Sequence, residues 1–507
     1  MSVDEPRAAR SAVGLRSERG PVLLALMLST ALIALDATIL ATAVPSVVAD
    51  LGGFSQFPWL FSIYLLTAAV TTPLYGRLSD VIGRRPVLLL GIGLFLVGSV
   101  LCGFAWSMPV LVIARGLQGL GAGAVQPVAL TMVGDLYSME ERARVQGYLA
   151  GVWGVASVLG PTLGGVFSEY LSWRWIFYVN LPVGALAVWL LLRHFRETVV
   201  RTRQPADVAG ALLLAGGSSL LVLGLLEGGV AWAWWSPAGV GVFVAAVALL
   251  VAFLAVERRA VAPVLPLWVF RHRVLVAGNL ASLCVGMLLM GLVTYVPAFA
   301  QGALGLSAVL VGFALAPLNI GWPIAATLSG RLYLRAGFRY TTVTGASCAV
   351  VATAAGALLL GEGSSVVLLA AVCFLIGVGM GLTASPSLVV VQSVVGWDRR
   401  GVVTGTAMFG RSLGSALGAA VFGAVANATI AARLADPPAA LAGRLPDSVD
   451  ASGQVLASGA GADPDVLAYL RSALALATHH VFVGMALVAV LMLVAVAFLP
   501  RRAEPLP

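Results

Sequence analysis

The sequence predicts an all-α polytopic membrane protein with fourteen transmembrane helices, and three observations carry this prediction. Of the 507 residues, 60% are apolar and only 10% are charged, whereas a soluble domain needs roughly 25% charged residues to cover its surface. The apolar residues form about fourteen runs of roughly 18 to 25 residues, the length needed to cross a hydrocarbon core. Basic residues gather in alternate connecting segments, which is typical of a chain that crosses a membrane repeatedly.

Each predicted span begins or ends where an apolar run meets arginine, glycine or proline. Pro21, Pro58 and Pro86 open the first three spans, because proline is tolerated in the first turn of a helix. The first six spans are expected at residues 21–47, 58–75, 86–105, 108–133, 145–167 and 175–192. The other eight are expected at residues 208–226, 238–256, 274–299, 308–329, 340–360, 366–391, 402–426 and 481–499.

The orientation of the chain follows from its charge. Every one of the 30 basic residues is arginine, and with the N-terminus inside most of them fall in inward segments. The outward segments hold only Arg174, Arg433, Arg444 and Arg471. The positive-inside rule therefore predicts both termini in the cytoplasm. The net charge of +8 comes from the arginines in the inward segments and does not indicate a nucleic-acid-binding surface. The lack of lysine and a composition rich in Ala, Gly, Val and Arg suggest a GC-rich bacterium, so the expected location is a bacterial plasma (inner) membrane.

The composition also excludes several kinds of chemistry. Without lysine the chain can form neither a P-loop nor a pyridoxal Schiff base. The four histidines lack metal-ligand spacing, so we expect no metal and no cofactor. The four cysteines fall inside predicted spans, where they are expected to be small apolar core residues rather than disulfides. We expect a protein that is not an enzyme.

An internal repeat relates the two halves of the chain. The tripeptide Gly-Arg-Leu at residues 76–78 recurs at 330–332, and Gly83 recurs as Gly337, both at an offset of 254. At the same offset the glycines Gly147, Gly151, Gly160 and Gly164 pair with Gly401, Gly405, Gly414 and Gly418. Parallel six-helix repeats with a site between them are a transporter architecture.

The repeat predicts how the chain is divided. Two six-helix bundles are expected at residues 21–192 and 274–499, with an inserted helix pair and its linkers at 193–273. Residues 1–20 and 500–507 are expected to be cytoplasmic tails. The second bundle contains a long outward loop at 427–475, for which a lid, a site for an extracytoplasmic partner and a disordered tether all remain open.

Two charged residues within the spans are candidates for proton coupling. Asp36 lies about 15 residues into the first span, where an ionised, unpaired carboxylate costs several kcal/mol. We expect it to hold a proton while sealed from water and to release it when a pathway or a cation reaches it. Arg115, at a similar depth, cannot shed its charge and is expected to couple to Asp36. The alternatives are a neutral Asp36 bonded to a helix carbonyl, and an Arg115 that only pins helices.

Several motifs resemble those of the major facilitator superfamily. The segment GRLSDVIGRR at 76–85 is similar to its signature loop, ARGLQGLGAG at 114–123 to its fourth-helix motif, and GPTLGG at 160–165 to its antiporter motif. LDATILATAVP at 35–45 and WRWIFYVNLPVG at 173–184 resemble elements of the fourteen-helix drug/proton antiporter branch. The resemblance covers nearly the whole chain.

The resemblance implies roles for particular residues. It assigns Arg115 to proton coupling and makes Asp80, with Arg84 and Arg85, a charge lock that favours the outward-facing state; the second half has Leu334 in place of Asp80. Gly76 and Gly83 are expected at tight turns. The conformational gating set is Gly76, Asp80, Gly83, Arg84, Arg85, Gly160, Pro161, Gly164 and Gly165, although the fifth-span glycines could equally serve packing alone.

Other polar and aromatic residues in the spans are candidates for a substrate path. Arg411, midway along the thirteenth span, is grouped with Asp36 and Arg115, and either lines a polar path or serves packing. The expected cavity residues are Tyr64, Gln118, Gln126, Trp153, Asn180, Met287, Tyr295 and Asn319.

These observations predict a proton-coupled multidrug efflux transporter that exports amphipathic or cationic compounds by alternating access. Its expected partners are a small-molecule substrate, protons and membrane lipids, with no nucleic acid. One alternative is export of an endogenous lipid, siderophore or metabolite. A membrane-embedded transferase is a different class, and it would need clustered His, Asp or Glu at one membrane face, whereas the spans hold isolated acids.

Overall fold

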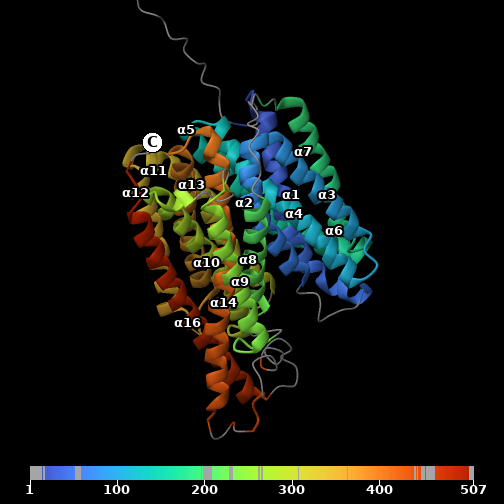
Figure 1. The fold of residues 1–507 in the computed structure, drawn as a ribbon. Coiled ribbons are helices and arrows are strands. Elements are labelled where there is room, and N and C mark those ends of the chain that lie inside the picture. The colour runs from blue at the N-terminus through green and yellow to red at the C-terminus, as the bar shows by residue number, and fades with distance from the viewer. Residues whose placement is uncertain are drawn as a thin grey trace, which may run out of the picture.

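A computed structural model of the chain describes residues 14, 17–51, 59–195, 197, 208–227, 232–260, 263, 267–306, 308–361, 363–438, 441, 443–446, 452 and 463–501. The regular structure of this part of the chain is almost entirely helical (Figure 1). Helix α1 begins and helix α16 ends at the same end of the bundle, which we call the terminal end. The opposite end is called the distal end.

The first half of the molecule contains seven α-helices. α6 and α7 together form the sixth apolar span, and a short π-helix, η2 (Phe167–Leu171), continues α5. The helices are α1 (Gly20–Leu51), α2 (Trp59–Ile82), α3 (Arg84–Gly103), α4 (Met108–Leu136), α5 (Met139–Val166), α6 (Trp175–Tyr178) and α7 (Asn180–His194).

The inserted pair and the second half follow. α8 (Val208–Glu227) packs along α9 (Pro237–Glu257). The second half contains α10 (Arg273–Gly302), α11 (Ala308–Ala336), α12 (Phe338–Leu359), α13 (Val366–Ser393), α14 (Arg400–Ala435) and α16 (Pro464–Ala497), with short 3-10 helices η3 (Leu267–Phe270) and η4 (Trp397–Arg399).

The prediction of a polytopic all-α membrane protein is confirmed. Within the described residues, 13 helical segments are long and apolar enough to cross a membrane. The remaining predicted span corresponds to α8, a helix of 20 residues in which the described residues Leu212–Leu221 form an apolar stretch.

The predicted loop at 76–85 is almost entirely helical. α2 continues to Ile82 and α3 begins at Arg84, so the turn between them is the single residue Gly83, with φ 104°. Gly337 makes the same one-residue turn between α11 and α12, with φ 91°. Residues with a side chain rarely adopt this conformation, which explains the glycine at both positions. Gly76 was expected at a turn as well, but it lies inside α2.

The predicted outward loop at 427–475 is shorter than expected. α14 extends to Ala435 and α16 begins at Pro464, so both helices continue well beyond the predicted spans. Figure 1 shows the two helices projecting beyond the rest of the bundle at the distal end. At their tip Leu441, Val466 and Leu470 form a small apolar cluster. We call these two ends and the described residues between them the distal hairpin.

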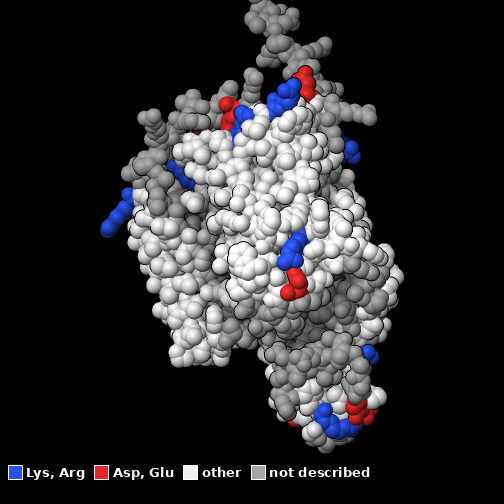
Figure 2. Space-filling model, turned by 90° about the vertical axis from the view of Figure 1, so that its right-hand side faces the viewer, with Lys and Arg blue, Asp and Glu red and all other residues white. Residues whose placement is uncertain are grey.

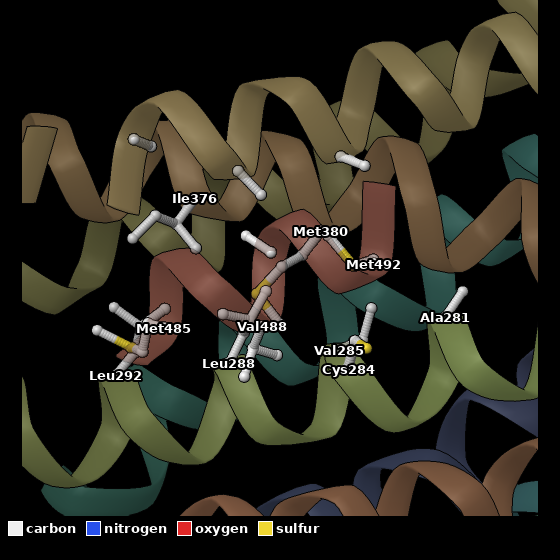
Figure 3. Packing of buried hydrophobic residues seen from close by; sticks show 14 of the residues in the cluster. Ala281, Cys284, Val285, Leu288, Leu292, Ile376, Met380, Met485, Val488 and Met492 are labelled. Atoms are coloured by element: carbon white, nitrogen blue, oxygen red, sulfur yellow. The ribbon is translucent and has the colours of Figure 1, made fainter. Parts of the chain in front are cut away.

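The cores of the two halves consist of tightly packed apolar side chains. In the second half α10, α13 and α16 bring together Leu288, Ile376, Met380, Met485 and Met492 (Figure 3). All four cysteines are free thiols, and three of them are fully buried.

The surface distribution of charge fits a membrane-spanning bundle. Figure 2 shows charged side chains at the terminal end and at the tip of the distal hairpin, and the face between them is largely uncharged apart from one pair of opposite charges. Large apolar side chains such as Val97, Ile113 and Phe313 are exposed. An uncharged apolar band of this kind is expected where a protein faces lipid.

Candidate functional site: a buried charge network and a lock between the halves

Asp36 of α1 and Arg115 of α4 form an ion pair inside the first half. Nη1 of Arg115 lies 2.6 Å from Oδ2 of Asp36. The two residues are 3% and 1% exposed, respectively. Nε of Arg115 donates to the carbonyl oxygen of Leu60 at 3.1 Å, and its guanidinium carbon lies 4.2 Å from the centre of the Tyr64 ring. The Arg115 guanidinium is therefore held by a carboxylate, a helix carbonyl and an aromatic face.

A chain of hydrogen bonds continues from this pair. Gln118 accepts from Arg115 at 2.6 Å and donates through Nε2 to Oδ1 of Asp36 and to the Ser99 hydroxyl, both at 2.8 Å. Asn180 of α7 donates to the same hydroxyl at 3.2 Å. We call these five residues the buried network. It joins α1, α3, α4 and α7, and most of its polar atoms bond one another, as buried polar groups normally do, whereas Oδ1 of Asn180 has no hydrogen-bond partner.

The two alternatives for Arg115 are both visible in its contacts, because it bonds a backbone carbonyl as well as the carboxylate. A lone Asp36 bonded to a helix carbonyl is not what the structure shows. The carboxylate receives Arg115 and Gln118 instead. The site can therefore keep a carboxylate charged in the interior, and it becomes unbalanced when that carboxylate gains a proton.

Arg411 does not join the buried network. It lies on α14 in the second half, and its side chain is half-buried. Among the described residues, no hydrogen bond, ion pair or ring contact to its guanidinium is found. The structure thus brings Asp36 and Arg115 together and places Arg411 elsewhere.

Asp80 at the end of α2 binds the N-terminus of α14 in the other half. Its Oδ1 accepts from the Gly401 amide at 2.9 Å and its Oδ2 from the Val402 amide at 2.8 Å. Arg84 lies 2.6 Å from the same carboxylate. The first amides of a helix have no partner within the helix and carry partial positive charge, so a carboxylate is their natural ligand.

Arg84 carries the contact further. Its Nε lies 3.0 Å from Asp135 of α4, its Nη2 donates to the Trp397 carbonyl at 2.8 Å, and its guanidinium carbon lies 4.2 Å from the centre of the Trp397 ring. Asp135 also binds Arg400 of α14 at 2.9 Å. We call Asp80, Arg84, Asp135, Trp397 and residues 400–402 the terminal lock.

The terminal lock contains residues that sequence reasoning missed. Asp135, Trp397, Arg400, Gly401 and Val402 were not predicted to take part in it. The sequence carried a signal for two of them: Arg400 is a basic residue of an inward segment, and Gly401 belongs to the repeated glycines. That a helix N-terminus faces Asp80 depends on how the halves meet, and a one-dimensional pattern does not contain this information.

Arg85 was expected in the charge lock, but it binds within the first half. Its guanidinium donates to the Leu192 carbonyl at 2.8 Å. The Arg84 and Arg85 amides both donate to Glu197, at 2.7 and 3.0 Å. Glu197 therefore caps the start of α3 beside the Gly83 turn.

Gly76 permits a close approach of the two halves. A Cβ atom at Gly76 would lie 2.7 Å from the Gly401 carbonyl oxygen, which leaves no room for a side chain. The predicted gating role of Gly76 thus has a steric basis, although not the expected turn.

The α5 residues of the gating set divide into two groups. Gly160 packs directly against Thr38 of α1, two residues from Asp36. Gly164 is buried, whereas Gly165 faces open space. Pro161 lies within α5, but its side chain is outside the described residues.

Three of the predicted cavity residues do not face an open cavity. Gln118 and Asn180 are fully buried in the buried network, and Tyr64 is buried against Arg115. The prediction is therefore corrected for these three, because hydrogen bonds hold Gln118 and Asn180 within the first half and the ring of Tyr64 packs against the Arg115 guanidinium. The others are half-buried: Gln126, Trp153, Met287, Tyr295 and Asn319.

Within the part of the chain that the structure describes, no group of three or more His, Cys, Asp or Glu side chains is placed to hold a metal ion. The site consists of a charge network inside one half and a lock that joins the two halves.

Two helical halves, a buried charge pair and a lock at one end define a polytopic membrane protein of the transporter type. The sequence profile of the Major Facilitator Superfamily matches residues 26–419. The chain belongs to this family.

Curated relatives and a solved structure agree with this assignment. The chain is 36% identical over 418 residues to the multidrug transporter protein MdtP of Bacillus subtilis (strain 168), covering 82% of this chain and 76% of MdtP. It is 34% identical over 418 residues to multidrug resistance protein 3 of the same organism, covering 82% and 81%. The fold is similar to that of the human organic anion transporter MFSD10 (TETRAN), with a TM-score of 0.61, 16% identity and coverage of 93% and 99%.

Proposed function

We propose that the chain is a proton-coupled exporter of amphipathic drugs that works by alternating access. Substrate enters from the cytoplasm or the inner leaflet, and protons move inward through Asp36 as substrate leaves. The names of the relatives, a multidrug transporter and a multidrug resistance protein, support drugs as the cargo. A membrane-embedded transferase is set aside by the family membership.

The observation that carries the proposal is the buried pair of Asp36 and Arg115. When the carboxylate is charged, it and the guanidinium neutralise each other. When it is protonated, Arg115 loses its counter-charge in a low-dielectric interior, at a cost of several kcal/mol unless the helices rearrange or water enters. The free energy of protonating Asp36 therefore differs between two conformations of the protein. Such a difference is what couples proton binding to a conformational change.

The terminal lock supports alternating access, because it closes the terminal end in the conformation described here. We propose that the terminal end faces the cytoplasm, in a bacterial plasma membrane, and that residues 21–192 and 274–499 are the moving bundles. Asp80, Arg84 and Gly76 close the cytoplasmic side in this conformation, and opening requires the bonds to Gly401 and Val402 to break.

We further propose that the distal hairpin lies outside the membrane, where it is the candidate site for an extracytoplasmic partner. Its apolar tip cluster and its ion pair between Arg444 and Asp463 give it a defined surface. The uncharged lateral band is the proposed contact with membrane lipids.

Transport in everted membrane vesicles tests the proposal. Vesicles that contain the native chain are expected to accumulate a fluorescent amphiphile when a proton gradient is imposed, and addition of substrate should release protons from the lumen. Asp36→Asn should abolish both the gradient-driven uptake and the proton release, because the amide cannot carry a proton.

Asp50→Asn is the matched control, because Asp50 is an exposed acid on the same helix. Equal membrane content of both variants is checked by immunoblot. Undiminished proton-driven uptake by Asp36→Asn would refute Asp36 as the proton carrier. The alternative cargo, an endogenous lipid, siderophore or metabolite, leaves this mechanism unchanged and differs only in the compound transported.

A further inference from the structure

A small apolar cluster, which we call the plug, joins the two halves next to the terminal lock. Leu130 of α4, Leu388 of α13, and Ala407 and Met408 of α14 form one cluster of packed side chains. The terminal lock lies on its terminal side, since α14 begins at Arg400 and α4 ends at Leu136. A ligand that reaches the plug must therefore come from the distal side in this conformation.

Three polar side chains lie one helical turn distal of the plug. Residues three or four apart share one face of a helix. Gln126 therefore lies on the face of Leu130, Ser385 on the face of Leu388, and Arg411 on the face of Met408. α4 and α13 run toward the terminal end and α14 runs away from it, so all three steps lead to the distal side.

All three side chains lack a partner among the described residues. Ser385 is only 5% exposed, and its hydroxyl oxygen has no hydrogen bond. Gln126 and Arg411 are half-buried, and no bond from either side chain is found within the described chain. Buried polar groups are normally satisfied. The unpartnered Ser385 hydroxyl, with Gln126 and Arg411 at the same level of helices that contact one another, therefore indicates a site for a ligand or water.

The charge at this site is positive. The acid at comparable depth, Asp36, is already paired with Arg115. Asp80 and Asp135 belong to the terminal lock. Arg411 has no counter-charge among the described residues, and an uncompensated guanidinium inside a membrane bundle is costly.

We infer that Gln126, Ser385 and Arg411 form a subsite for the carboxylate of an amphipathic substrate. The guanidinium supplies the charge and a fork of donors that matches a carboxylate, and the hydroxyl and amide supply further donors. Amphipathic acids and zwitterions thus become the preferred cargo, instead of the cations expected from the sequence. This inference rests on the proposed function, because it names the substrate class of the same transport path.

Equilibrium binding to three probes with one apolar body tests the inference. The probes are naphthylacetate, naphthylacetamide and naphthylethylamine, which carry a negative, zero and positive charge at neutral pH. Binding to the full chain in lipid nanodiscs is measured by isothermal titration calorimetry without a proton gradient. The native chain should bind the acid at least about tenfold more tightly than the amide, as a charge-assisted hydrogen bond provides, and the amine most weakly.

Variants assign the preference to its residues. Arg411→Gln should abolish the preference for the acid, Arg411→Lys should keep part of it, and Ser385→Ala should reduce the affinity for the acid several-fold. Arg433→Gln, at an exposed arginine on the same helix, should behave as the native chain. Folding of each variant is checked by its elution volume and melting temperature.

Four results would each overturn the inference. The native chain binds the acid and the amide equally, it binds the amine more tightly, or it binds none of the probes. The fourth result is a preference for the acid that survives in Arg411→Gln. Asp36→Asn is expected to retain the preference for the acid. Failure of this subsite and failure of proton coupling are therefore separate results.

Discussion

The Gly401 amide of α14 donates a 2.9 Å hydrogen bond to the carboxylate of Asp80 at the end of α2, across 321 residues of sequence. The lock between the halves is therefore a contact between a side chain and the positive end of a helix, as well as an ion pair. In the second half the equivalent position is Leu334, which is exposed. Only one of the two repeated turns thus carries this carboxylate, so the halves are not locked symmetrically.

Asp80→Asn should weaken the terminal lock. The neutral amide loses the attraction to Arg84 and to the start of α14, which we expect to cost the closed state about 1–3 kcal/mol. Spin labels at Arg144 on α5 and Arg335 on α11, in a background without the native cysteines, report the distance between the halves. The variant should show a larger population of long distances. Asp398→Asn is the control, since Asp398 is exposed with only a 3.7 Å contact to Arg399. Equal distance distributions for the native and Asp80→Asn chains would show that Asp80 does not hold the halves together.

Gly401→Ala should open the same contact for a steric reason. A Cβ atom at Gly401 would collide with the Asp80 carboxylate and the Gly76 carbonyl. Overpacking of this kind costs about 1–3 kcal/mol, and the distance measurement described for Asp80→Asn should show it. Gly93→Ala provides the comparison, because nothing lies within 4 Å of a Cβ atom at Gly93. If both alanine variants behave alike, close approach at Gly401 is not what holds the halves together.

Glu197→Gln should destabilise the start of α3. Glu197 accepts hydrogen bonds from the Arg84 and Arg85 amides, and loss of its charge at a helix N-terminus should cost about 1 kcal/mol. The melting temperature of the purified protein is expected to fall. Glu18→Gln, at an exposed glutamate, should leave it unchanged. A melting temperature that stays constant in Glu197→Gln would show that the cap adds no stability.

Arg115→Lys should impair coupling although the charge is kept. A lysine ammonium cannot reproduce the bonds that Arg115 makes to Asp36, Gln118 and the Leu60 carbonyl. We expect gradient-driven transport to fall at least about tenfold, as loss of a charged hydrogen bond implies. Arg193→Lys, at an exposed arginine of α7, is the control. Native rates in Arg115→Lys would mean that only the positive charge is needed.

Asp50 predicts a small pH dependence of stability at the distal end of α1, beyond the apolar span Gly20–Leu40. Hydrogen bonds from Trp173 and Arg174 lower the pKa of Asp50 below its ordinary value. A carboxylate with a lowered pKa stabilises the fold above its unfolded pKa of about 4, and this contribution disappears as the pH falls through the folded pKa. Because the pair is exposed, the effect should be at most about 1 kcal/mol. Asp50→Asn should lower the melting temperature slightly at pH 7, and the difference from the native chain should shrink as the pH falls below about 4 toward the folded pKa of Asp50. A difference that stays constant over this acid range would exclude the charge as its cause.

Much of the fold could be predicted from the sequence, because crossing a membrane requires long apolar runs that are visible in one dimension. The limits of helices could not be predicted in the same way. Hydropathy ends the thirteenth span at residue 426, but helix propensity continues it, and the alanine-rich stretch to Ala435 stays helical in α14. The same difference lengthened α16 and removed most of the loop at 76–85.

The sequence predicted the level of the site residues along their helices, but it could not predict the side to which their side chains point. Counting residues placed Asp36 and Arg115 at one level, and the structure joins them at 2.6 Å. The same counting could not show that Gln118 and Asn180 turn toward Ser99, or that Ser385 turns toward a plug. Those facts depend on the rotation of each helix about its axis, which only the packing of neighbours determines.

The length of α14 links the two ends of the molecule. It runs without interruption through 36 residues, from the bonds to Asp80 to the tip of the distal hairpin. At 1.5 Å per residue this is a rod of about 54 Å, and a small tilt at one end becomes a displacement of several ångströms at the other. A rigid lever of this length would carry movement at the terminal lock to the distal hairpin, so an antibody fragment raised against the tip could report, or arrest, what happens at the opposite end of the molecule.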